Sequence, residues 1–259
     1  MKNLSLRTVT VMRYILPLRE GGSLPALAEA DDDFKYVIKF RGAGHGVKML
    51  ISELLGGMIA SKLELQIPEL VFANLDVDFG RMEADEEIQD LLKFSEGLNL
   101  GLHFLSGAIA YDSSITIDAV LASKIVWLDA FITNIDRTFK NTNLMMWHKE
   151  LWVIDNGASF YFHHSWQNFD AAAKTPFKYV KDHVLLSQAT QLREADLFAK
   201  EHLNDEFFRN LVDLIPDEWL QWNDTDETPD EIRQVYFQFM KTRLANSEIF
   251  LKEAENARR

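Results

Sequence analysis

The chain has 259 residues, of which 47% are hydrophobic and none is cysteine, so it can bury a sizeable core but cannot form disulfides or thiolate metal sites. It carries 27 Lys and Arg against 40 Asp and Glu, a net charge of −13, and no Lys/Arg cluster, which argues against a nucleic-acid-binding protein. No apolar run approaches the ~20 residues that span a bilayer, and the N-terminus lacks the features of a signal peptide. We therefore expect a cytoplasmic protein whose partners include neither nucleic acid nor a membrane.

The N-terminal part of the chain has the pattern of strands interrupted by a long helix. Three segments are rich in β-formers and alternate in hydrophobicity, and they predict strands over residues 7–20, 34–40 and 67–77. The segment GGSLPALAEADDD interrupts the first two of them. A period of about 3.6 predicts helices over 47–63 and 83–95. Residues 98–106 predict a short strand or an extended link.

The C-terminal part is mostly helical. Thr116 or Asp118 could cap a helix that ends near Ile132. A β-hairpin is expected next, with strands NLMMW and LWVID over residues 143–147 and 151–155. Four further helices are predicted over residues 191–203, 205–214, 217–222 and 229–256.

Strands with one helix, followed by helices with one hairpin, predict an α+β chain with two lobes. We place the boundary between residues 97 and 112, which gives an N-terminal lobe over 1–105 and a catalytic helical lobe over 106–259. A cleft between two such lobes is a common ligand site.

A kinase-type site needs a strand lysine for nucleotide phosphates, a helix acid to orient it, a catalytic Asp with an Asn about five residues later, and a metal-binding Asp after a nearby strand. The chain offers Lys39, Glu53, Asp136, Asn141 and Asp155 in this order. Each residue alone has an ordinary structural explanation, because DNG, for example, is also a hairpin turn. Their joint order on suitable elements favours a Mg²⁺–phosphate site.

Several motifs resemble the compact HipA-like kinase family of bacteria: FKYVIKFRGAGHG, ELVFANLD, IVWLDAFITNIDRTFKNTNLMMW and LWVIDNGASFYFHH. The resemblance covers about residues 10–170. It implies a two-lobed protein-kinase-like fold that uses ATP and magnesium. By motif, Lys39 is the phosphate-holding lysine, Asp136 the catalytic aspartate, and Asn141 and Asp155 the metal ligands.

The same resemblance implies further nucleotide-binding residues. Gly21, Gly22 and Ser23 are similar to a short phosphate loop whose backbone N–H groups could hold phosphate oxygens. Arg41 in FRGAGHG could contact phosphate or an acidic partner group. The resembled family is related to the HipA toxin, which is regulated through a phosphate-loop serine, so the resemblance makes Ser23 a candidate autophosphorylation site as well.

The chain departs from the pattern of the resembled family at its N-terminus. It lacks the toxin's larger N-terminal region, so toxin activity and the toxin's substrate do not carry over. Lys140 could neutralise the transferring phosphoryl group, or it could be a solvated loop lysine. His163 and His164 favour core packing or cleft lining over metal binding, because adjacent residues on a strand point to opposite faces.

Three functions remain open at this point. The first is an ATP- and Mg²⁺-dependent kinase acting on a protein Ser/Thr or on a small hydroxyl compound, with a further protein partner possible. The second is a pseudokinase that binds nucleotide as a regulatory module. The third is a helical binding protein, which would leave the ordered constellation unexplained.

Overall fold

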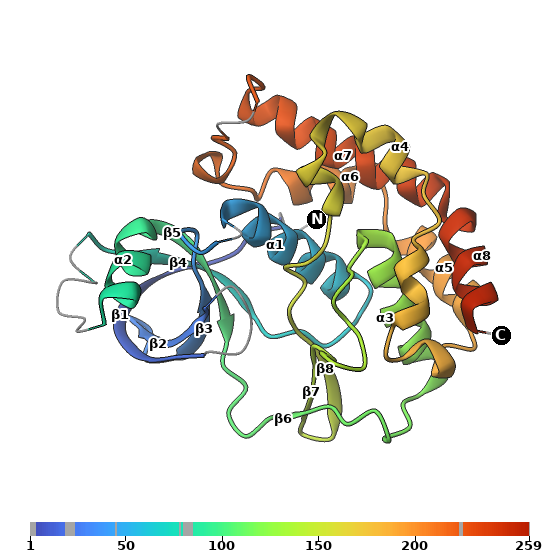
Figure 1. Ribbon diagram of the computed structural model, residues 1–259, viewed down its shortest axis with the longest axis horizontal. Coiled ribbons are helices and arrows are strands. Elements are labelled where there is room, and N and C mark those ends of the chain that lie inside the picture. Colours follow the sequence, from blue (N-terminus) through green and yellow to red (C-terminus); the bar gives the residue numbers. More distant parts are fainter. Residues whose placement is uncertain are drawn as a thin grey trace.

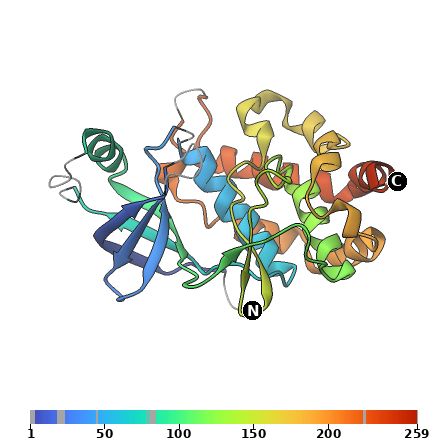
Figure 2. The same ribbon diagram turned by 60° about the horizontal axis from the view of Figure 1, so that its bottom comes forward.

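The computed structural model describes residues 4–18, 24–44, 46–77, 79, 85–222 and 225–258. Five strands form a closed barrel in the order β1-β2-β3-β5-β4, and a mainly helical part lies beside it (Figures 1 and 2). The strands are β1 (Thr8–Pro17), β2 (Ala26–Ala30), β3 (Lys35–Lys39), β4 (Leu70–Leu75) and β5 (Gly97–His103). The expected α+β chain with a mainly β N-terminal lobe and a mainly helical C-terminal lobe is therefore confirmed.

The barrel closes because β1 pairs parallel with β4 over Thr8–Thr10, while the other neighbours pair antiparallel. Alternate residues such as Val9, Val11, Tyr36 and Ile38 fill its interior. Strand β2 was not predicted, because its sequence ALAEA has low β-propensity. It forms because β1 and β3 pair with both of its edges.

Helix α1 (Gly46–Lys62) lies between the barrel and the helical part in both views (Figures 1 and 2). Eleven of its residues are buried, on nearly every face, because it packs on both lobes. Helix α2 (Glu86–Phe94) starts at the Asp85 side chain, which accepts hydrogen bonds from the backbone N–H groups of Glu87 and Ile88 at 3.0 and 3.5 Å. Both helices were predicted.

The helical lobe is built around α3 (Ala119–Ile132), which is also buried on nearly every face. As expected, Asp118 caps it and accepts from the N–H groups of Val120 and Leu121 at 3.0 Å. The predicted hairpin is strands β7 (Leu144–Trp147) and β8 (Glu150–Val153), with β6 (Ile109–Ala110) beside β7. Its turn residues, His148 and Lys149, both have positive φ, as a two-residue type I′ turn requires.

The remaining helices are α4 (Phe169–Ala173), α5 (Leu192–His202), α6 (Asp205–Val212), α7 (Pro229–Ala245) and α8 (Ser247–Arg258). The single helix expected over 229–256 was wrong, because the chain breaks at Asn246, whose side chain donates to the Thr242 carbonyl at 2.8 Å. Between residues 161 and 188 the chain forms α4 and short 3₁₀ turns that no helical period in the sequence indicated. The helix expected over 217–222 is one such 3₁₀ turn, η5 (Asp217–Trp219).

Among the described helices, none has both the length and the apolar character needed to cross a bilayer. The chain leaves the barrel at His103 and reaches β6 through a short segment with a turn at Ser106 and Gly107. We keep the lobe boundary near residues 105 and 106 as a proposal.

Candidate active site

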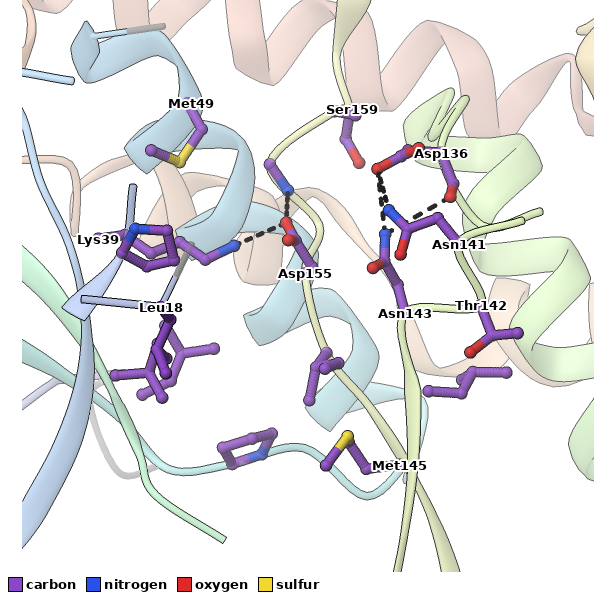
Figure 3. A pocket seen from close by; sticks show the side chains of 18 of the residues that line it. Leu18, Lys39, Met49, Asp136, Asn141, Thr142, Asn143, Met145, Asp155 and Ser159 are labelled. Atoms are coloured by element: carbon purple, nitrogen blue, oxygen red, sulfur yellow. Dashed lines mark hydrogen bonds and ion pairs between the residues drawn. The ribbon is translucent and has the colours of Figure 1, made fainter. Parts of the chain in front are cut away.

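Three charged side chains from distant parts of the chain meet on the side of the barrel that borders the cleft, and Figure 3 shows two of them, Lys39 and Asp155. Lys39 ends β3, Glu53 lies in α1, and Asp155 follows β8. The Lys39 ammonium lies 2.8 Å from a Glu53 carboxylate oxygen and 2.6 Å from one of Asp155. The same Glu53 oxygen accepts the backbone N–H of Asn156 at 2.8 Å. Glu53 therefore fixes both the lysine and the segment that carries Asp155.

With both carboxylates ionised, the triad has two negative charges and one positive charge, and therefore one negative charge in excess. Burial alone would lower the pKa of Lys39, but the charges of Asp155 and Glu53 outweigh it and raise that pKa. For Asp155, burial is outweighed by the charge and hydrogen bond of Lys39, so its pKa falls below its ordinary value. The Asp155 side chain is 42% exposed and Glu53 only 1%. A cation in the cleft can therefore reach Asp155.

Asp155 adopts a backbone conformation that few non-glycine residues use, with φ at +54°. The segment after it passes very close to α1, since a Cβ added at Gly56 would lie 2.7 Å from the Cβ of Asn156. The N–H of Gly157 also donates to the Asp155 carboxylate at 3.3 Å. Strained conformations of this kind are concentrated at functional sites, where the surrounding structure enforces them.

The second polar group comes from the loop between α3 and β7. An Asp136 carboxylate oxygen accepts the side-chain N–H of Asn141 at 2.7 Å and that of Asn143 at 3.3 Å (Figure 3). Because Asn141 donates through its nitrogen, its amide oxygen is left for another ligand. Asn134 accepts the backbone N–H of Asp136 at 3.1 Å. Asp136 is thus held in place while staying partly accessible.

A buried network that the sequence analysis missed supports this loop. Arg137 is fully buried and donates to Asp129 at 2.6 Å, to the Asn156 side chain at 3.0 Å and to the carbonyls of Asn143 and Ile154. It therefore joins the Asp136 loop to the Asp155 segment. The available signal was Asp129 itself, a carboxylate within the apolar run IVWLDAFI, because a buried charge needs a partner.

His183 completes the network. Its Nδ1 accepts the backbone N–H of Leu185 at 3.0 Å, so its Nε2 carries the hydrogen and donates to Asp129 at 2.8 Å. Burial would raise the pKa of Asp129, but Arg137 and His183 outweigh it and hold that pKa below its ordinary value. Asp129 is thus a buried carboxylate with a full set of donors.

One cleft of about 970 Å³ is bordered by both polar groups. Its barrel side is apolar except for Lys39 and His103, and its helical side carries Asp136, Asn141 and Asp155 (Figure 3). Ser159, also missed from the sequence, lines it as well, and its buried hydroxyl has no hydrogen-bond partner in the described part of the chain. Apolar residues that line the cleft include Leu18, Val37, Met49, Leu102, Met145 and Ile154.

The other candidate residues lie elsewhere or outside the described chain. Arg41 forms an ion pair with Glu218 of the helical lobe and also donates to its carbonyl at 3.3 Å. Lys140 is exposed next to Asn141. The proposed phosphate loop, residues 21–23 with Ser23, lies outside the described residues. These nucleotide contacts remain predictions.

His163 also lines the cleft, and it is 2% exposed. Its Nδ1 lies 2.9 Å from the hydroxyl of Tyr236, and burial lowers its pKa well below the ordinary value. Within the described residues, no cluster of three or more His, Asp and Glu side chains could hold a metal ion. The strand assumed here from the sequence was wrong, because His163 and His164 lie in the 3₁₀ turn η1 (Tyr161–His164), from which the His163 side chain packs against Tyr236 and lines the cleft.

The barrel, the helical lobe and the charged groups between them define a two-lobed kinase fold. The HipA-like kinase family model matches residues 11–250, and the chain belongs to this family. No curated protein sequence matches the chain significantly.

Two solved structures are similar to the chain at low sequence identity. The crystal structure of the Helicobacter pylori proinflammatory kinase CtkA aligns with a TM-score of 0.54 and 12% identity, over 97% of this chain and 98% of that one. The Golgi casein kinase with Mn/ADP bound aligns with a TM-score of 0.48 and 11% identity, over 97% of this chain and 74% of that one.

Proposed function

We propose that the protein transfers the γ-phosphoryl group of Mg-ATP to a hydroxyl group, with a protein Ser or Thr as the acceptor. The observation that carries the proposal is the position of Lys39, Asp155 and Asp136 on the border of one cleft, with the buried Glu53 paired to Lys39 behind it. Phosphoryl transfer depends mostly on positioning and charge stabilisation. The ion pairs and the buried network of this site supply both.

The nucleotide would lie with its base against the apolar side of the cleft and its phosphates toward Lys39. This ammonium is already oriented by Glu53 at 2.8 Å and Asp155 at 2.6 Å, which leaves its third N–H to bind a phosphate oxygen. The chain segment 103–105, which joins the barrel to the helical lobe, also lines the cleft. It would be close to the base.

The residues present fit a magnesium ion. Mg²⁺ in phosphate sites takes one or two protein carboxylates and otherwise uses phosphate and water oxygens. Asp155 offers an accessible carboxylate and Asn141 a free amide oxygen. The ion would neutralise phosphate charge, and the excess negative charge of the triad favours a cation at this place.

Asp136 would accept the proton of the acceptor hydroxyl. Its carboxylate is held by two amide donors, Asn141 and Asn143, which fix its direction without neutralising it. The unpartnered hydroxyl of Ser159 could hydrogen-bond to the acceptor or to a phosphate oxygen. The acceptor hydroxyl would then face the γ-phosphate, with its proton directed at Asp136.

Nucleotide binding that requires both magnesium and Asp155 is the direct test of the site. Calorimetry of the wild-type protein with ATP should give tight binding with Mg²⁺ and much weaker binding with EDTA. Asp155→Ala should abolish that metal dependence, because it removes the accessible carboxylate. Asp90→Ala, an exposed aspartate on α2, serves as the control and should behave as wild type. Unchanged affinity and metal dependence in Asp155→Ala would contradict the proposal.

A further inference from the structure

The loop that carries Asp136 lies beside the segment of residues 178–184. Thr138 and His183 form an antiparallel bridge, and the N–H of Val184 donates to the Arg137 carbonyl at 3.2 Å. Since the two segments run in opposite directions from this bridge, Lys140 and Lys181 extend toward the same side of it.

Exposed aromatic rings lie on these two segments and at the cleft next to Asp136. Phe139 is 64% exposed, Tyr179 is 62% and Tyr161 is 59%. Tyr161 lines the cleft beside Asp136, and its backbone N–H donates to Thr133 at the start of the same loop. Exposed aromatic rings are costly to leave in water and are enriched in protein interfaces. A small hydroxyl substrate would lie within the cleft and would have no use for exposed rings outside it.

The same surface carries lysines without a carboxylate partner. The 3₁₀ turn η3 (Lys178–Asp182) repeats every three residues, so Lys178 and Lys181 lie on one face of it. Both are exposed, as is Lys140, while Val180 of the same turn is buried. Among the described residues, no carboxylate lies within ion-pair distance of these three lysines.

The positive charge of these three lysines is opposite in sign to the net charge of the whole chain, which is −13. Asp182 is the acidic residue within η3, so it offsets part of the positive charge there. Nearby Lys174 is already paired with Asp170 at 2.7 Å. Three unpaired lysines on the Asp136 loop and on the segment bridged to it would attract a negatively charged partner, while the rest of the surface would repel it.

We propose that this surface, formed by Phe139, Lys140, Tyr161, Lys178, Tyr179 and Lys181, docks the phosphate acceptor, and that the acceptor is an acidic protein segment whose Ser or Thr is flanked by Asp and Glu. This inference rests on the proposed function and narrows its substrate class. The aromatic rings would contact the acceptor chain, and the lysines would pair with its carboxylates. The acceptor hydroxyl would then enter the cleft toward Asp136.

Binding of defined peptides tests the proposal without requiring turnover. The probes are two fluorescent peptides with one central serine, flanked by Asp and Glu in one and by Lys and Arg in the other. Fluorescence anisotropy with Mg-ATP present should give at least about tenfold tighter binding of the acidic peptide, with strong weakening by salt. Equal affinities, or a preference for the basic peptide, would overturn the inference.

Charge reversal identifies the surface. The double variant Lys178→Glu/Lys181→Glu should bind the acidic peptide about five- to tenfold more weakly than wild type. The matched control Lys35→Glu/Lys93→Glu changes the net charge equally at exposed lysines of the barrel lobe, and it should retain wild-type affinity. Equal weakening in both variants would mean that only the overall charge matters, and would overturn the docking surface.

Two further readouts separate this inference from the function on which it rests. Mg-ATP affinity, measured on the same samples, should be unchanged in Lys178→Glu/Lys181→Glu. If the wild-type protein does not bind Mg-ATP, the proposed function is refuted. If it binds Mg-ATP but has equal affinity for the acidic and the basic peptide, only the docking surface is refuted. Equally effective competition by a single-stranded RNA oligonucleotide would also overturn it, because it would reveal a generic attraction for polyanions.

Discussion

At the scale of single residues, the site depends on charges that are buried but fully partnered. Arg137 and Asp129 are each at most 1% exposed and form one ion pair at 2.6 Å. Removing one member of such a pair leaves a buried charge without a partner. This destabilises the folded state by more than the intact pair stabilises it. This explains how a loop rich in polar groups can lie on an apolar core.

The titration of Asp129 gives a prediction for the pH dependence of stability. Its pKa is lower in the folded protein than in the unfolded chain. Its ion pair therefore contributes stability above about pH 4, and that contribution is lost as the pH falls through the folded pKa. Asp129→Asn should lower the free energy of unfolding by roughly 3 kcal/mol at pH 7, and by less at pH 3.5.

Urea unfolding of both proteins at the two pH values measures this difference. Asp90→Asn, which changes an exposed aspartate on α2, should match wild type at both. If the gap between wild type and Asp129→Asn stays constant with pH, the ionised state of Asp129 is not what stabilises the loop.

Several of these residues could be predicted from the sequence, and others could not. Lys39, Glu53, Asp136, Asn141 and Asp155 were expected together, because their residue types and order carry a chemical requirement. The structure brings them to the border of one cleft or into direct contact with residues that line it. Their roles in binding and catalysis remain predictions.

The supporting residues could not be predicted in the same way. Arg137, His183 and Ser159 act through tertiary contacts with distant segments, and a local pattern does not contain these contacts. Arg41, for which the sequence left contact with phosphate or with an acidic group open, pairs with Glu218, which lies 177 positions further along the chain. A pairing over such a separation leaves no signal in a single sequence.

At the scale of elements, long and strongly periodic helices were predictable, whereas weak or irregular elements were not. Helices α1 and α3 were expected almost to the residue. Strand β2 is alanine-rich and depends on its two neighbours, and the 3₁₀ turns between residues 161 and 188 depend on side-chain packing. Phe162, for instance, stacks on Phe239 with ring centroids 4.1 Å apart.

The close contact between α1 and the segment after Asp155 can be tested by adding one methyl group. In Gly56→Ala the new Cβ would lie 2.7 Å from the Asn156 Cβ and 3.2 Å from Ile132. Such overpacking costs about 1–3 kcal/mol, although alanine is the better helix former. We expect a lower melting temperature and weaker Mg-ATP binding, since the displaced segment carries Asp155.

The matched control is Gly44→Ala, where an added Cβ would meet no atom within 4 Å. It should retain the melting temperature and nucleotide affinity of wild type. A stabilised Gly56→Ala would show that helix propensity outweighs the close contact, and that the segment can move away without cost.

At the scale of the whole molecule, the two lobes are joined by more than the segment 103–105. The 3₁₀ turn η5 reaches back to the barrel, where the Trp219 side chain donates to the Leu98 carbonyl at 2.9 Å and its ring meets Phe72 edge-on. Arg41 and Glu218 pair at the same contact. These interactions fix how the lobes face each other, and hence how Lys39 faces Asp155.

This arrangement matters because neither lobe holds the proposed site alone. Lys39 and Glu53 come from the β3–α1 part of the chain, and Asp136, Asn141 and Asp155 from the helical lobe. The central claim is that these groups form one kinase site in which Asp136 accepts the proton of the acceptor hydroxyl.

The most direct test is the turnover of Mg-ATP by Asp136→Asn, measured with a serine peptide or as autophosphorylation, beside a nucleotide-binding isotherm for the same sample. Asparagine is isosteric with aspartate, so the fold and the Mg-ATP affinity should stay close to wild type. Because the accepting charge is lost, turnover should fall by roughly 10²- to 10⁴-fold. Full turnover in Asp136→Asn would contradict the account, because a loop-forming residue would tolerate the change equally well.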